Sequence, residues 1–376
     1  MLAVAVPLFD TAAPLVPLRA EIDRAIAAVV DSGRFVLGPQ VEAFEGEFAA
    51  YCGAAHAVGV ANGTEAITIA LRALGVGPGD EVVVPSFTFY ASAEAIPPTG
   101  ARPVFCDVDP DTMCVTAETV RAALTPRTRA VIAVHLFGGL APVAEIAALG
   151  VPVIEDAAQA AGTVGPSGAR PGSLGALATF SFFPSKNLGA FGDGGAVTTQ
   201  DAELAERVRV LRFHGSRDKA TYEQVGYNSR LDELQAAVLR VLLPHLDEWS
   251  DGRRAAAAAY RDAGLGELVT LPVALPGVRP AWHLYVVRCE TADGLAAALG
   301  AAGIEARAYY REPVHRQPAM RDYRGRRPLP VTDELARTHL ALPISPVLSR
   351  EAVAEVVAAA RAADLPGCGP AVSSPA

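Results

Sequence analysis

Lysine is almost absent from this chain. Its 376 residues include 32 lysines and arginines together, but only Lys186 and Lys219 are lysine. Arginine serves wherever a surface cation is needed, whereas a lysine amine can lose its proton and form an imine. A lysine that persists against such a bias indicates chemistry rather than solubility. Lys186 stands between an apolar run and a glycine cluster, in FSFFPSKNLGAFGDGGAVTT of residues 180–199.

Other absences exclude whole classes of protein. The five cysteines are odd in number and scattered without a CxxC pair, so neither a disulfide framework nor a zinc site is indicated. No apolar run approaches the ~18 residues that a membrane span needs, and the apolar start MLAVAVPLFD lacks the basic residues of a signal peptide. A net charge of −9 argues against a nucleic-acid binder. We therefore expect a cytoplasmic protein with a small-molecule partner.

The order of apolar segments predicts an α/β fold. From about residue 55, short β-branched runs alternate with helical segments, as in a sheet with crossover helices. The segments ATFSFF and GGAVTT then follow one another with little helix between them. We therefore expect a mixed, mostly parallel sheet.

A proline marks the expected domain change. A long helical tract starts at Asp232, meets Pro244 and resumes, and proline inside such a tract kinks or ends a helix. We expect a large domain over residues 1–245, which includes the N-terminal arm. A smaller α+β domain over 246–365 should contain strands at WHLYVVRC and EARAYY, followed by a disordered tail over 366–376.

Two motifs could supply an anion site and an acid. Gly63 and Thr64 lie between a strand and the start of a helix, where backbone N–H groups attract a phosphate, although Thr64 could simply cap the helix. In VPVIEDAAQA, Asp156 ends a buried strand and Gln159 follows one turn into an expected helix. Acids at the carboxyl ends of such strands lie where α/β proteins bind ligands. Asp156 could equally cap that helix and do nothing more.

Asp156 and Lys186 together predict a site for pyridoxal phosphate. The lysine would form an imine with the cofactor aldehyde, and the carboxylate would pair with the protonated pyridine nitrogen and keep the ring an electron sink. Phe89, at a strand end in SFTFYAS, could lie against the flat ring, or it could be an ordinary core aromatic. Ser181 could donate a hydroxyl to the phosphate, or it could face a neighbouring strand.

The motifs as a set resemble the DegT/StrS family of sugar aminotransferases, which depend on pyridoxal phosphate. They occur in the family's order from about residue 6 to about residue 360, and they include ANGTEAITIALRALGVGPGDEVVVPSFTF, PVIEDAAQA, SFFPSKNLGAFGDGGAV, GYNSRLDELQAAVLRV and AWHLYVVR. The resemblance implies a type I aminotransferase fold and a homodimer. The active sites would lie at the subunit interface.

The resemblance also implies roles for individual residues. Lys186 would be the imine-forming base, Asp156 the partner of the pyridinium, Gln159 a contact to the ring hydroxyl and Phe89 the stacking residue. The phosphate would be held by Gly63, Thr64 and Ser181, joined by Asn228 of the other subunit. Tyr310 and His315 would contact the sugar nucleotide, although His315 could be an ordinary loop histidine.

Differences from the family's sequence pattern, and two local motifs, bear on which substrate the protein uses. Ala161 replaces a histidine found in many members, and HLFGG replaces HLYGQ, which leaves substrate choice open. Some relatives carry histidine in place of the lysine and are dehydratases, so Lys186 favours amino transfer. The GDGG motif and HGSRDK resemble the subgroup that acts on nucleotide-linked 3-keto deoxysugars, with L-glutamate as amino donor. The alternatives are a 4-keto sugar or cyclitol aminotransferase, a lyase, and a non-catalytic regulatory protein that binds the cofactor.

Overall fold

The computed structural model describes residues 6–325 and 327–363. A seven-stranded sheet forms the centre of the larger part, in the order β1-β7-β6-β5-β4-β2-β3. Neighbouring strands run parallel except at β7, which is antiparallel to β1 and β6. The predicted mixed, mostly parallel sheet is confirmed. The strands are β1 His56–Val60, β2 Glu81–Pro85, β3 Arg102–Cys106, β4 Thr128–Val134, β5 Val153–Asp156, β6 Leu177–Ser181 and β7 Gly195–Thr199.

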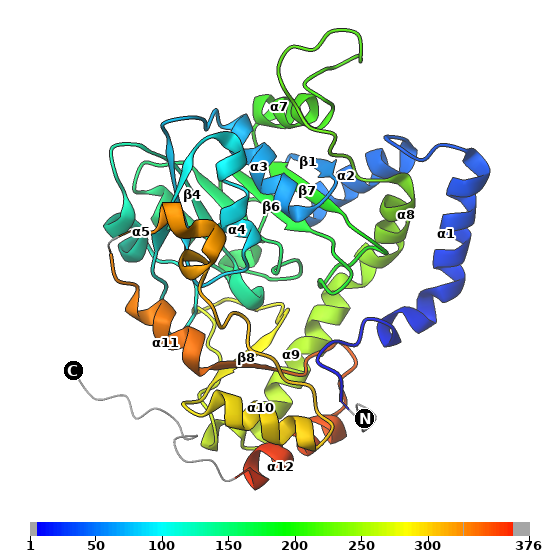
Figure 1. Cartoon of the computed structure of the whole chain (residues 1–376). Coiled ribbons are helices and arrows are strands. Elements are labelled where there is room, and N and C mark those ends of the chain that lie inside the picture. The colour runs from blue at the N-terminus through cyan, green and yellow to red at the C-terminus, as the bar shows by residue number, and fades with distance from the viewer. Residues whose placement is uncertain (1–5, 326, 364–376) are drawn as a thin grey trace.

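Helices cover both faces of this sheet (Figure 1). Side chains of a strand alternate between faces, so Val197 joins the core under α3 and α7 while its neighbour Ala196 joins the core under α2 and α8. Helix α1 packs outside, against α8. The helices are α1 Arg19–Ser32, α2 Pro39–Cys52, α3 Gly63–Ala73, α4 Ala91–Glu94, α5 Ala117–Ala123, α6 Val143–Ala147, α7 Ala202–Arg212 and α8 Glu233–Leu242, with 3-10 turns η1 Ala13–Leu18, η2 Pro97–Thr99, η3 Leu136–Gly138 and η4 Pro166–Gly168.

After α8 the chain meets Pro244 in the 3-10 turn η5 (Leu243–His245) and continues into α9 (Leu246–Asp262) and a second, smaller sheet. The predicted interruption is confirmed, because proline has no N–H to continue the helical ladder. Here β8 (Tyr285–Arg288) and β9 (His339–Leu342) form an antiparallel pair. They share a core with α9, α10 and α12. The remaining elements are α10 Ala292–Ala301, α11 Pro330–Thr338, α12 Arg350–Ala362, η6 Leu265–Glu267, η7 Val314–Arg316 and η8 Pro318–Tyr323.

The domain boundary after residue 245 stays a prediction. The expected tail over 366–376 lies outside the described residues. Within the described ranges, no group of three or more His, Cys, Asp or Glu side chains is arranged to hold a metal ion. No helix in those ranges has the length and apolar character to cross a membrane.

Two sequence predictions of secondary structure are wrong. The segment after Asp156 forms turns rather than a helix, because Gly162 takes a left-handed φ of 96° and packs so tightly that an added Cβ would lie 2.1 Å from Ser250 Oγ. The segment EARAYY is not a strand. Within it only Arg307 pairs with β9: its N–H donates to the Ala341 carbonyl, and its carbonyl accepts from the Ala341 N–H.

Candidate active site

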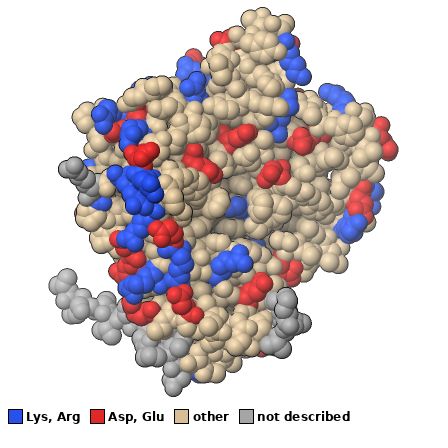
Figure 2. Space-filling view, in the orientation of Figure 1, with Lys and Arg blue, Asp and Glu red and all other residues tan. Residues whose placement is uncertain are grey.

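A cavity of about 580 Å³ lies where β5 and β6 end. Figure 2 shows a hollow near the centre of this face, with a basic group in its depth. Lys186 is the sole lysine or arginine among the described residues that line the cavity. Most of the predicted site residues meet here, as the carboxyl ends of parallel strands require: Gly63, Thr64, Phe89, Asp156, Gln159, Ser181, Lys186 and Tyr310.

Lys186 lies in the loop that joins β6 to β7. Its backbone N–H donates to the carbonyl of Phe183 at 2.8 Å, and Gly189 packs so closely that an added Cβ would lie 2.5 Å from the Pro184 carbonyl oxygen. Burial lowers the pKa of the Lys186 amine from its ordinary 10.5 to about 8, against the opposing effect of the Asp156 carboxylate. Near neutral pH a useful fraction of this amine is therefore unprotonated, as a nucleophile or a base requires.

Asp156 is the last residue of β5 and is buried. Ser92 Oγ donates to Asp156 Oδ2 at 2.6 Å, and the N–H of Ala158 donates to Oδ1 at 3.2 Å. Ser92 in turn lies 3.1 Å from the hydroxyl of Thr88. The segment before and within α4 therefore fixes the Asp156 carboxylate on this wall of the cavity.

The start of α3 forms a cradle beside Ser181. The side chain of Asn62 caps the helix by accepting from the N–H of Glu65 at 2.9 Å. A Cβ added to Gly63 would lie 2.7 Å from the Ser181 Cβ, so only glycine allows this approach. The first N–H groups of a helix lack intrahelical partners and attract anions. Gly63, Thr64 and Ser181 therefore come together as a phosphate site requires.

Two aromatic residues and an amide form a further wall. Phe89 keeps 52% of its surface exposed, although it lines the cavity. Its ring lies 5.9 Å from that of Tyr310. Gln159 is held from two sides, because Oε1 accepts from the N–H of Phe137 at 2.8 Å and Nε2 donates to the Tyr310 hydroxyl at 3.2 Å. An exposed aromatic face here is available to a flat ligand.

The sequence matches the DegT/DnrJ/EryC1/StrS aminotransferase family over residues 17–361. The chain belongs to this family. It is 50% identical over 366 residues, 95% of each chain, to the dTDP-3-amino-3,4,6-trideoxy-alpha-D-glucose transaminase of Streptomyces venezuelae. It is 46% identical to the UDP-N-acetyl-3-dehydro-alpha-D-glucosamine 3-aminotransferase of Acidithiobacillus ferrooxidans, over 95% of this chain and 97% of the other. The crystal structure of S. venezuelae DesV with a ketimine intermediate matches with a TM-score of 0.91 and 48% identity, over 96% of this chain and 99% of that one.

Aminotransferases of the DegT/DnrJ/EryC1/StrS family use pyridoxal phosphate, and the residues of the cavity fit this cofactor. An amine with a lowered pKa and a buried carboxylate face the same space. The cradle at Gly63 suits the phosphate, and the exposed ring of Phe89 suits the planar pyridine. Lys186 would hold the aldehyde end of the cofactor, and Asp156 the ring nitrogen.

Two predicted site residues lie elsewhere. Asn228 is exposed and pairs with Phe213, at the base of the loop that projects beyond α7 in Figure 1. His315 lies in η7, where its Nδ1 is 2.6 Å from the hydroxyl of Ser86. Neither borders the cavity of its own chain. Their assignment to the phosphate and the sugar nucleotide stays a prediction, and for Asn228 it depends on a second subunit.

Several residues that reasoning from the sequence did not single out also border the cavity, among them Phe9, Ser92 and His283. Ser92 stands within YASAE, where nothing in the local pattern separates it from an ordinary helix residue. His283 belongs to the family motif AWHLYVVR, which was a usable signal. Phe9 reaches the cavity because the hydrogen bond from the Leu8 N–H to Glu305 at 3.0 Å anchors its segment.

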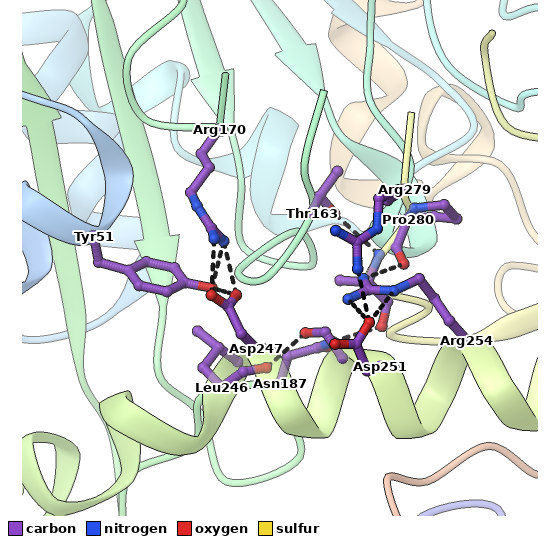
Figure 3. A network of polar contacts seen from close by, with 12 residues as sticks. Tyr51, Thr163, Arg170, Asn187, Leu246, Asp247, Asp251, Arg254, Arg279 and Pro280 are labelled. Atoms are coloured by element: carbon purple, nitrogen blue, oxygen red, sulfur yellow. Dashed lines mark hydrogen bonds and ion pairs between the residues drawn. The ribbon is translucent and has the colours of Figure 1, made fainter. Parts of the chain in front are cut away.

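Polar contacts tie α9 to the segments that surround the site (Figure 3). Arg170 donates to both carboxylate oxygens of Asp247 at 2.9 Å and to the Tyr51 hydroxyl at 2.7 Å. One turn further along α9, Asp251 accepts from Arg254 and Arg279. The contact of Arg170 with Asp247 is bidentate, which adds strength and a fixed geometry to the ion pair. The smaller part is thereby held in place beside the cavity.

Proposed function

We propose that this protein is a cytoplasmic transaminase that moves an amino group from L-glutamate to a nucleotide-linked 3-keto-6-deoxyhexose. The nucleotide is dTDP, and the product is a 3-amino sugar for antibiotic or glycan biosynthesis. The observation that carries this proposal is the lysine with a lowered pKa facing a buried carboxylate in one cavity. The choice of the 3-keto sugar is supported by the names of the relatives at 50% and 46% identity.

Each residue of the cavity has a separate role in the proposed reaction. Pyridoxal phosphate, when bound, supplies an electron sink for the carbanion that forms beside it. The Lys186 amine, once free, is placed to move the proton of the donor α-carbon, which is general acid–base catalysis. Asp156 would hold a proton on the ring nitrogen, and Gly63, Thr64 and Ser181 would bind the phosphate. The aromatic wall at Phe89 orients the ring and excludes water.

The keto substrate is tested by product analysis. The protein is incubated with L-glutamate and, in turn, with dTDP-linked 3-keto and 4-keto sugars and a keto cyclitol, and each aminated product is identified by mass spectrometry and NMR. We expect amination at C3 of the 3-keto sugar. Preferred amination of the 4-keto sugar or the cyclitol would replace the substrate assignment with one of the alternatives.

A separate measurement distinguishes an enzyme from a regulatory protein that only binds the cofactor. L-glutamate alone should convert the yellow, lysine-bound cofactor into its colourless amine form, with one equivalent of 2-oxoglutarate released. A spectrum that L-glutamate and other amino donors leave unchanged would favour the regulatory alternative. The intact pair of Lys186 and Asp156 supports catalysis, because cofactor binding alone does not require an imine-forming amine.

The homodimer with shared active sites is tested by complementation. If Asn228 completes the partner's site, Lys186→Ala and Asn228→Ala subunits are each impaired alone. Mixed dimers then contain one site with both native residues, so unfolding and refolding the two variants together should restore about a quarter of the wild-type activity. Recovery that does not exceed the sum of the separate variants would place Asn228 outside the partner's site.

A further inference from the structure

His283 is a buried polar side chain without a hydrogen-bonding partner. Only 4% of its surface is exposed, and it borders the same cavity as Lys186. No hydrogen bond joins its ring to any residue in the described part of the chain, and Nδ1 is fully buried and unpartnered. The ring of Phe9 stacks on it at 5.9 Å and fixes its plane.

The backbone beside His283 is strained and firmly held. Trp282 has a left-handed φ of 44°, which is costly for a bulky residue. Its carbonyl accepts from the buried Arg253 at 3.2 Å, and the carbonyl of Ala281 accepts from Asn187 at 2.9 Å. Gly138 approaches so closely that an added Cβ would lie 2.8 Å from the backbone nitrogen of His283. Strained backbone of this kind persists only where surrounding contacts hold it in place, and it is concentrated at functional sites.

His283 is in a charge state that can accept a hydrogen bond. Burial, together with the positive charges of Lys186 and Arg253, holds the pKa of His283 well below its usual range. The ring is therefore neutral at physiological pH and keeps one unprotonated nitrogen. A buried polar atom without a partner is unfavourable, so this nitrogen needs a donor, and Lys186 is the one charged donor among the residues described around the cavity.

We propose that His283 is a positioning residue for Lys186: once the ε-amine has been released from the cofactor, a change of its rotamer brings it to a ring nitrogen of His283, which accepts a hydrogen bond from it. The contact fixes the direction of the amine while it moves protons. Phe9 and the strained Trp282 backbone hold the imidazole in place for this contact. The inference rests on the proposed function, because it requires Lys186 to alternate between bound and free forms.

The chain allows a direct test because it has only two lysines. In a Lys219→Arg background, Lys186 carries the sole lysine ε-amine. The full-length protein is loaded with pyridoxamine 5'-phosphate, which leaves that amine free, and reductive methylation of Lys186 is followed by mass spectrometry as a function of pH. This readout needs no turnover, and in the parent protein the pKa of Lys186 should be near 8.

A lost hydrogen bond should lower this pKa. The bond stabilises the ammonium form of Lys186 more than the neutral amine, so His283→Phe, which keeps the stack on Phe9, should lower the pKa by about 1. His283→Gln retains an acceptor and should restore the parent value. Phe9→Ala removes the ring that stacks on the imidazole, so it should also lower the pKa of Lys186, but by less than His283→Phe does. This second variant tests the proposal if His283→Phe does not fold. An unchanged pKa in His283→Phe would overturn the proposal.

A matched histidine supplies the control. His339 is also buried and its Nε2 likewise lacks a partner, but its Nδ1 is paired with the Leu335 carbonyl and it does not border the cavity. His339→Phe should leave the pKa of Lys186 unchanged. If His283→Phe instead raised only the KM for L-glutamate or the keto sugar, the ring would bind substrate and the proposal would fail. Failure of the proposed function is recognised separately, as the absence of a lysine-bound cofactor in the wild-type spectrum.

Discussion

Replacing Lys186 with alanine should abolish transamination while the protein still folds and binds pyridoxal phosphate. The side chain lines the cavity at the base of the β6–β7 loop, and its backbone contacts do not depend on the amine. Loss of general-base assistance alone typically costs ~10² to 10⁴-fold in rate, and loss of the covalent attachment adds to this. We expect a decrease of at least about 10⁴-fold in steady-state turnover.

Two controls show whether the loss of activity comes from the missing amine or from the missing charge and volume of the side chain. Lys186→Arg keeps a cation of similar reach, but a guanidinium does not form the imine, so it should be as inactive as Lys186→Ala. An added small primary amine should restore part of the proton transfer in Lys186→Ala, because the truncated side chain leaves room for it. Thermal unfolding of each variant should stay close to wild type. Substantial turnover by Lys186→Ala without added amine would rule out the assignment of this lysine.

The sequence carried enough information to predict the sheet and the residues at its edge. Parallel strands bring their carboxyl ends together, so Asp156 and Ser181, at the ends of neighbouring strands, had to lie near one another. The start of α3 could be predicted because the spacing of apolar residues changes at Gly63 from that of a strand to that of a helix. Lys186 stood out because lysine is so rare in the chain.

Other features of the site depend on contacts that no local pattern encodes. The turns after Asp156 follow from the close approach of Gly162 to α9, almost a hundred residues further along the chain. Ser92 and His283 reach the cavity from separate segments, and their importance is visible only once their partners, or the absence of partners, are known. Asn228 and His315 matched a family pattern, yet one chain does not bring them to its own cavity.

Substitution of Asp156 by asparagine should give the second large effect. Asparagine keeps the shape of the side chain but removes the charge that would hold a proton on the ring nitrogen, so the electron sink is weakened. Loss of one preorganised electrostatic group commonly costs ~10² to 10³ in kcat, and we expect a decrease in this range. The cofactor should still bind through Lys186 and the phosphate cradle, which absorbance of the purified variant would check.

An independent readout shows whether the charge of Asp156 is responsible. The carboxylate raises the pKa of Lys186, in opposition to burial. Asp156→Asn should therefore move the Lys186 pKa further below about 8, measured by the pH dependence of reductive methylation. Ser92→Ala removes the 2.6 Å hydrogen bond but not the charge, so it should reduce kcat by only about tenfold. If Asp156→Asn and Ser92→Ala had equal effects, the role of Asp156 would be to order the cavity wall rather than to supply charge to the cofactor ring.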